Sequence, residues 1–88
     1  MAITTIYPTT HFVKAYRNLP EKIRLYAKQK EEIFKVDPFD NRLKTHKLKG
    51  RFRKLWPYSI NYQYRIVFRF IDDETVIYYN IGTHDVYR

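Results

Sequence analysis

Cysteine is absent from this chain of 88 residues, and glycine occurs only twice. Without cysteine there is no disulfide framework and no thiolate zinc site. The three histidines are scattered along the chain, so a histidine metal site is not expected either. We therefore expect no metal and no other cofactor, and the lack of cysteine fits a reducing cytoplasm.

Long hydrophobic runs are also lacking. No window approaches the roughly 18 consecutive apolar residues that a membrane-spanning helix requires. The opening MAITTIYPTTHF does not combine a charged start with a continuous apolar run, as an export signal would. We therefore expect a cytoplasmic protein that neither spans a membrane nor is exported.

Negative charge is missing from one part of the chain. Residues 1–40 carry seven basic and five acidic side chains, whereas residues 41–71 carry no acidic residue at all. The net charge of +8 and the pI near 9.8 indicate a partner that is a polyanion. The basic residues of the acid-free stretch are Arg42, Lys44, Lys47, Lys49, Arg51, Arg53, Lys54, Arg65 and Arg69.

Apolar side chains are present in sufficient number for a core. They make up 44% of the residues, and aromatic residues alone make up 18%. This composition argues against a disordered basic tail, and the length suits one small core. We expect residues 1–88 to form a single domain.

The first forty residues predict one strand and two helices. Residues 2–7 alternate and are rich in β-branched side chains, which is typical of a strand, and we expect the following proline to end it. Thr9 or Thr10 can cap a first helix, in which apolar residues recur at helical spacing. Pro20 suits the first position of a second helix, and Asp37 with the proline after it ends that helix.

The remaining residues predict a sheet. A basic connection follows the second helix, with a short strand expected around Thr45 to Leu48. Three runs dense in aromatic and β-branched residues, 55–60, 62–70 and 74–81, are separated by short loops and predict an antiparallel meander. The order β-α-α-β-β-β indicates an α+β domain, with an antiparallel sheet and a two-helix hairpin packed on one face.

Strand register predicts which side chains meet at the end of this sheet. If the last hairpin closes at Asp72 and Asp73, opposing residue numbers sum to about 145, which sets Arg65 opposite Asn80. His84 then lies at the same end of the sheet as Arg65. Alternation assigns Arg65 and Arg69 to the face away from the helices, and Tyr62, Tyr64, Ile66, Phe68 and Phe70 to the face that seats them.

Four segments carry a family resemblance. They are ITTIYPTTHFVKAYRNLP (3–20), LKTHKLKG (43–50), LWPYSINYQYRIVFRF (55–70) and NIGTHDVYR (80–88). In this order and spacing the chain resembles the RelE/ParE superfamily of toxins from type II toxin-antitoxin systems, in its YafQ-like branch. The resemblance implies a RelE-like fold and a ribosome-dependent mRNA endonuclease that cuts codons in the ribosomal A site and inhibits translation. It also implies a small acidic antitoxin, encoded adjacently, that holds the toxin inactive.

The resemblance also implies a set of catalytic residues, His46, Arg65, His84 and Tyr87. This chain departs from the pattern at three points. Ser59 and Gln63 stand where YafQ-like enzymes carry a histidine and an aspartate, and neither can transfer a proton. Tyr87 follows His84 by three residues, whereas the aromatic residue commonly follows by four.

Metal-free RNA cleavage needs a base for the ribose 2′-OH, an acid for the leaving 5′-oxygen, and cations for the charge at phosphorus. Arg65 can present a two-pronged donor to the scissile phosphate. His84 can act as acid or base, and we favour the acid. The basic run, with Phe52 and Trp56 available for stacking, suits RNA. The expected RNA-binding residues are Lys44, Lys47, Lys49, Arg51, Arg53, Lys54 and Arg69.

Plainer interpretations stand beside these. His84 could cap strand ends, His46 could only touch phosphate or solvent, and Tyr87 could anchor the end of the chain against the sheet. At the level of function, a ParE-like poison of DNA gyrase shares the expected fold and charge. A non-catalytic relative that binds RNA or an antitoxin is a further alternative, motivated by Ser59 and Gln63.

Overall fold

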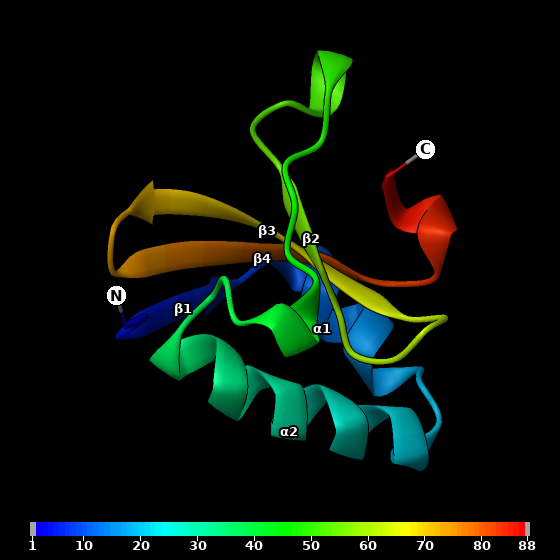
Figure 1. The fold of residues 1–88 in the computed structure, drawn as a ribbon. Coiled ribbons are helices and arrows are strands. Elements are labelled where there is room, and N and C mark those ends of the chain that lie inside the picture. Colours follow the sequence, from blue (N-terminus) through cyan, green and yellow to red (C-terminus); the bar gives the residue numbers. More distant parts are fainter. Residues whose placement is uncertain (1, 88) are drawn as a thin grey trace.

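Two helices cover one face of a four-stranded sheet in the computed structural model, which describes residues 2–87 and, of Tyr87, only the backbone (Figure 1). The spatial strand order is β1-β4-β3-β2. The predicted α+β class with its β-α-α-β-β-β order is confirmed. The elements are β1 (Thr5–Pro8), α1 (Thr10–Arg17), α2 (Glu21–Val36), β2 (Trp56–Ser59), β3 (Arg65–Asp72) and β4 (Thr75–Gly82), with the 3₁₀ turns η1 (Asn41–Leu43), η2 (Gly50–Phe52) and η3 (His84–Tyr87).

The helices begin and end close to the predicted residues. Thr9 is the N-cap of α1, and its hydroxyl accepts a hydrogen bond from the Phe12 amide at 3.0 Å. The same hydroxyl donates to the carbonyl of Tyr79 at 3.0 Å, so the cap also ties α1 to β4. Pro20 is the N-cap of α2 instead of its first residue, and the helix ends just before Asp37. No helix among residues 2–87 is long and apolar enough to cross a membrane.

The sheet is mixed, which corrects one predicted feature. Strands β2, β3 and β4 form the expected antiparallel meander, but β1 runs parallel to β4, with Thr5 beside Thr75 and Pro8 beside Tyr78. Alternation within a strand does not encode its direction, so the pairing of segments 70 residues apart could not be inferred from it. The first strand was expected to stop before Pro8, but Pro8 is the last residue of β1. This is possible because β1 is an edge strand, and edge strands tolerate proline.

The prediction of a short strand at Thr45 to Leu48 is wrong, because these residues form no regular secondary structure. Only isolated backbone hydrogen bonds hold this segment beside β2, from the His46 amide to the Pro57 carbonyl (3.4 Å) and from the Leu48 amide to the Leu55 carbonyl (3.2 Å). We call residues 44–55 the basic arm. In Figure 1 it is the green segment that rises from the sheet on the side opposite α2 and carries η2 at its tip.

The predicted register between β3 and β4 is also corrected. Arg65 lies opposite Gly82, not Asn80. The turn is formed by Asp73 and Glu74, and the register shifts twice along the hairpin because Ile71 and Tyr79 are each an extra residue in their strand. The turn one residue further along the chain accounts for the change at Arg65, because the two β-bulges lie on opposite strands and cancel over the length of the hairpin.

An aromatic cluster between α2 and the sheet forms the centre of the core. The Phe34 ring lies 4.6 Å from that of Tyr58 and 4.8 Å from that of Phe68, measured between centroids. The hydroxyls of Tyr58 and Tyr78 are hydrogen-bonded at 2.8 Å, and burial raises the pKa of both phenols. Phe68 faces the helices, as alternation predicted, and this packing fixes the orientation of the whole sheet.

Candidate functional site

A cationic pocket of about 310 Å³ lies where α2, η1, the end of β2 and the start of β3 meet. None of the described residues that line it is acidic. We define the cationic pocket by its lining residues, which are Lys30, Arg42, Lys44, Ser59, Ile60, Asn61, Tyr62 and Arg65. Positive charge gathered in a concave site attracts anions more strongly than the same charge on an open surface.

Arg65 occupies a fixed position in this pocket. It is the first residue of β3, paired with Ser59 on one side and with Gly82 on the other. Its Nη1 donates to the carbonyl of Tyr62 at 3.4 Å, and its side chain is half-buried. The strand and this hydrogen bond together orient the guanidinium, whose remaining N–H groups are available to an anion.

The loop between β2 and β3 forms one wall of the pocket. The side-chain oxygen of Asn61 accepts hydrogen bonds from the amides of Gln63 (2.9 Å) and Tyr64 (2.7 Å). The Ile60 amide donates to the Tyr64 carbonyl at 3.0 Å. These bonds make a defined turn of the kind that asparagine favours. Tyr62 projects from it and is 82% exposed.

Tyr62 therefore departs from its predicted place. It was expected on the strand face that seats the helices, but β3 begins only at Arg65 and the loop carries Tyr62 outside the sheet. The amides of Gln63 and Tyr64 bond to the side chain of Asn61, so the backbone turns here and the strand alternation does not extend back to Tyr62.

Arg42 is held at the pocket by Asp40. Its Nε and Nη2 donate to the two carboxylate oxygens of Asp40, each at 3.0 Å, and its amide donates to Oδ1 at 2.9 Å. The side-chain hydrogen bonds from Arg42 lower the pKa of Asp40 to about 2. Lys30, Lys44 and Arg65 form no ion pair within 4.0 Å in the part of the chain that the structure describes. The pocket is therefore cationic in spite of the paired Arg42.

Lys44 turns the chain out of the pocket into the basic arm. Its backbone is in the left-handed region, with φ of 53°, which is unusual for a residue other than glycine. The next residue, Thr45, donates through its hydroxyl to the Pro38 carbonyl at 2.6 Å. The Nδ1 atom of His46 lies 3.0 Å from the Lys44 carbonyl. Because a carbonyl only accepts, this bond needs a proton on Nδ1 and leaves Nε2 of the exposed imidazole without a role in it.

His84 lies at the same end of the sheet as Arg65. It is exposed and begins η3, two residues after Gly82, the partner of Arg65. A Cβ at position 82 would come within 2.6 Å of Cγ1 of Val86, so glycine allows η3 to fold back against the strand end. Figure 1 shows η3, in red, on the same side of the sheet as the basic arm. The side chain of Tyr87 lies outside the described residues.

The remaining predicted RNA-binding residues lie on exposed surfaces outside the pocket. Arg69 is exposed on β3, and five basic residues of the arm are exposed as well, namely Lys47, Lys49, Arg51, Arg53 and Lys54. The Arg51 guanidinium lies 4.9 Å from the centroid of the Phe52 ring. Trp56 was expected to be available for stacking, but it is half-buried between Phe39 (5.5 Å) and Phe70 (5.7 Å) and belongs to the core.

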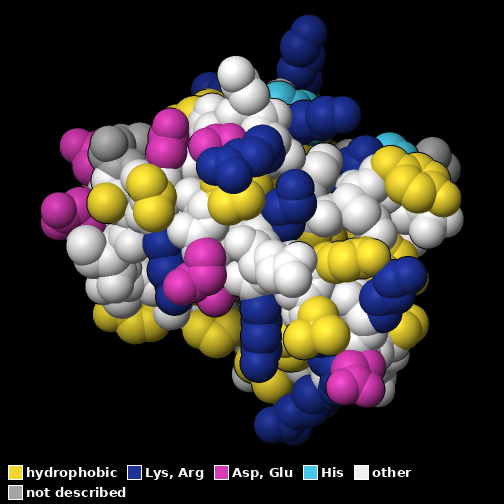
Figure 2. Space-filling view, turned by 60° about the horizontal axis from the view of Figure 1, so that its bottom comes forward, with side chains coloured by type: hydrophobic (Ala, Val, Ile, Leu, Met, Phe, Trp, Pro, Cys, Tyr) yellow, Lys and Arg dark blue, Asp and Glu magenta, His cyan; other side chains and the backbone are white. Residues whose placement is uncertain are grey.

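Sequence reasoning missed two cations of the pocket. Lys30 belongs to the half of the chain with nearly balanced charge, and α2 carries it to the β2–β3 loop. Arg42 was counted in the acid-free stretch but was not assigned to the site. In Figure 2, most acidic side chains of the visible face lie in its left half, while Lys and Arg extend across the centre and right. The one sequence feature that could have indicated the position of Arg42 is the nearby Asp40, whose carboxylate can pair with the guanidinium.

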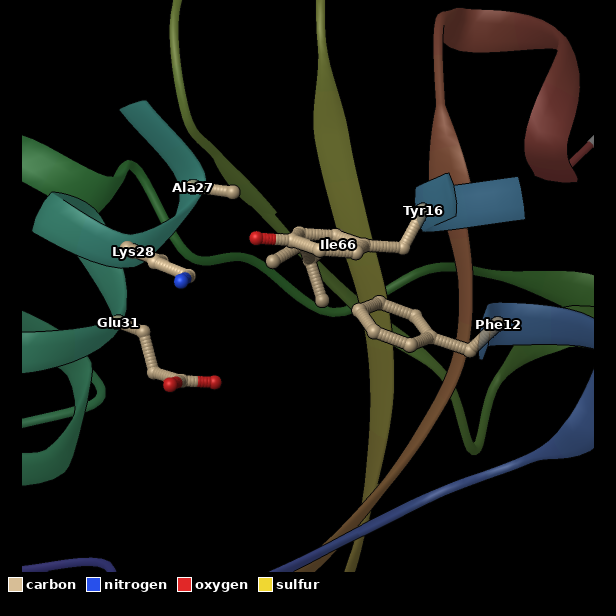
Figure 3. Close-up of a pocket in the computed structure, with 6 residues that line it drawn as sticks. All are labelled: Phe12, Tyr16, Ala27, Lys28, Glu31 and Ile66. Carbon is tan, nitrogen blue, oxygen red and sulfur yellow. The ribbon is translucent and has the colours of Figure 1, made fainter. Parts of the chain in front are cut away.

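A different hollow lies between the two helices. It has a volume of about 250 Å³ and is lined by Phe12, Tyr16, Ala27, Lys28, Glu31 and Ile66, as Figure 3 shows. Its apolar walls and the carboxylate of Glu31 do not suit a phosphate. Among the described residues no group of three or more His, Cys, Asp or Glu converges in a way that could hold a metal ion.

Comparison with known proteins identifies solved structures that share this fold. No protein-family model and no curated relative matches the chain. Solved structures do match, among them a YoeB/ParE toxin from Agrobacterium tumefaciens, with 18% identity, a TM-score of 0.77, and coverage of 92% of this chain and 99% of that chain. The RelBE2 toxin-antitoxin complex from Mycobacterium tuberculosis matches with 18% identity, a TM-score of 0.77, and coverage of 96% and 100%. The DinJ-YafQ complex from E. coli matches with 11% identity, a TM-score of 0.71, and coverage of 98% and 97%.

The chain therefore has the fold of the RelE/ParE toxins. The resemblance inferred from the sequence is confirmed at this level, and structures of YafQ are among those that match.

Proposed function

We propose that this chain is the toxin of a toxin-antitoxin pair and that it inhibits translation as a ribosome-dependent mRNA endonuclease. The observation that carries the proposal is the cationic pocket, in which Arg65 is oriented by β3 at the end of the sheet where η3 begins with His84. A fixed guanidinium, other cations nearby and an exposed imidazole are the groups that phosphodiester cleavage without a metal requires.

In the proposed reaction the ribose 2′-oxygen attacks the adjacent phosphorus. A base removes the proton of the 2′-OH, the bond from phosphorus to the 5′-oxygen breaks, and an acid protonates that leaving oxygen. The products are a 2′,3′-cyclic phosphate and a free 5′-hydroxyl. We assign charge stabilisation at phosphorus to Arg65 and proton donation to the leaving oxygen to His84. His46 is a candidate for the base, because its hydrogen bond to the Lys44 carbonyl uses only Nδ1, and Tyr87 is the remaining candidate for proton transfer or stacking.

The proposed partner is a small acidic antitoxin encoded beside the toxin. The net charge of +8 and the acid-free stretch favour a partner that is rich in carboxylates. Several of the matching structures are toxin-antitoxin complexes. An antitoxin that covers the basic arm and the cationic pocket would exclude RNA by occupying both the charge and the space.

Mapping mRNA ends in a translating extract tests the activity. We expect the wild-type protein to cut mRNA within codons, and Arg65→Ala and His84→Ala to cut at least about a hundredfold more slowly. Arg17→Ala and His11→Ala are matched controls, because both side chains are exposed on α1, away from the pocket. Full cleavage by Arg65→Ala and His84→Ala would refute the assigned site. DNA damage with intact mRNA would instead indicate a gyrase poison.

A further inference from the structure

A second hollow adjoins the cationic pocket across the β2–β3 loop. Its volume is about 620 Å³, within the range of roughly 300–1,000 Å³ that is typical of small-molecule sites. The two spaces share a wall formed by Lys30, Ile60, Asn61 and Tyr62, and we call the two adjoining spaces together the trough. The residues that line only the second hollow are Lys22, Ile23, Tyr26, Gln29 and Gln63.

The chemistry of the walls changes along this trough. The pocket end carries Arg42, Lys44 and Arg65, whereas the second hollow adds the apolar Ile23 and the aromatic Tyr26 beside Lys22 and two glutamines. The half-buried Tyr26 ring has the ammonium of Lys22 at 5.8 Å from its centroid. No acidic side chain is found among the described residues that line either part. A ligand that matches both ends is negatively charged at the pocket end and, at the other end, offers a flat ring with polar edges.

We propose that the trough binds one nucleotide of a single-stranded nucleic acid, with its phosphate in the cationic pocket and its base stacked on Tyr62. The inference rests on the proposed function, because it gives the RNA substrate a contact on the α2 side of the β2–β3 loop. Single strands are held in this way elsewhere, by cations along the backbone and aromatic rings under the bases. The amides of Gln29 and Gln63 lie along the same trough, where they can meet the edge of a base.

Tyr62 is suited to stacking because its position is set before a ligand arrives. The loop hydrogen bonds to Asn61 fix the backbone on both sides of the tyrosine. Arg65 strengthens this arrangement by donating to the Tyr62 carbonyl, which links the stacking residue directly to the phosphate-binding one. Little backbone entropy is then lost when a base covers the ring.

Binding of a 2′-O-methyl tetranucleotide at fixed ionic strength tests the proposal. This probe has no 2′-OH and cannot be cleaved by the proposed reaction, and an abasic probe of equal charge lacks only the bases. We expect the wild-type protein to prefer the probe with bases by roughly tenfold, Tyr62→Ala to abolish this preference, and Tyr62→Phe to keep it. Tyr7→Ala is the matched control, because Tyr7 is 56% exposed on β1 and should keep the full preference.

Equal binding of the two probes by the wild-type protein would overturn the proposal, as would an unchanged preference in Tyr62→Ala. An acidic peptide with leucine side chains serves as a third probe. If Tyr62→Ala weakens only the peptide, the trough is a protein-binding site and the inference is wrong. A base preference without any mRNA cleavage would refute the proposed function alone, whereas cleavage without a base preference would refute this inference alone.

Discussion

The core between α2 and the sheet and the cationic end of the sheet are built on opposite principles. In the core, Phe34 is completely buried among aromatic rings, and the hydroxyls of two buried phenols are hydrogen-bonded to each other. At the cationic end, side chains of like charge face a solvent-filled pocket, and backbone carbonyls, loop turns and one carboxylate hold them. Burial therefore stabilises one region, while the other keeps unbalanced charge that only a bound anion neutralises.

Removing the central ring of the core should have the largest effect. Phe34→Ala is expected to lower the free energy of unfolding by about 3–5 kcal/mol, because it opens a cavity between three aromatic rings. Val36→Ala, at a side chain 73% exposed on the same helix, should change it by less than about 0.5 kcal/mol. Urea denaturation measures both. A loss under about 1 kcal/mol for Phe34→Ala would contradict the assigned centre of the core.

Changing the guanidinium of the pocket into an ammonium should affect activity and leave stability alone. Arg65→Lys keeps the charge but loses the two-pronged donor, so mRNA cleavage should slow by about ten- to a hundredfold. The urea midpoint should stay unchanged, because the side chain is only half-buried. Arg17→Lys on α1 is the control. Wild-type cleavage by Arg65→Lys would show that charge alone suffices at this position.

The effects of removing the two buried hydroxyls, of Tyr58 and Tyr78, on the free energy of unfolding should not be independent. Tyr58→Phe leaves the Tyr78 hydroxyl without this partner, and we expect a loss of about 1–3 kcal/mol in the free energy of unfolding. The double variant Tyr58→Phe with Tyr78→Phe should lose less than the sum of the two single changes. Additive losses, measured by urea denaturation, would mean that the two hydroxyls do not support each other.

The ion pair between Asp40 and Arg42 at the rim of the pocket should affect mainly the pKa of Asp40. Asp40 has a lowered pKa in the folded state, so its contribution is present above the ordinary carboxyl pKa of about 4 and is lost as the pH falls toward 2. Carboxyl NMR should give Asp40 a midpoint near pH 2, and Arg42→Ala should move that midpoint up. The pair is exposed, so stability should change little. An ordinary midpoint in the wild-type protein would contradict the pairing.

Parts of the candidate site could be predicted because their signals are local. The acid-free charge of residues 41–71 is visible in composition, and Arg65 and His84 were inferred to share one end of the sheet from a tight turn. The exact pairing of Arg65 with Gly82 could not be predicted, since the acidic run of residues 72–74 does not show which two of its residues form the turn. Lys30 was missed because helical periodicity shows that it is polar but not which loop it approaches.

The sequence by itself determined the two helices, the three-stranded meander and the location of the positive charge. Capping residues, prolines and alternation act over a few residues, and they decide these features before any distant contact forms. Only the tertiary structure decided that β1 runs parallel to β4, that Trp56 is half-buried and that Tyr62 stands out beside the cationic pocket. These features depend on contacts between distant segments, whose geometry is set by how the aromatic core packs as a whole.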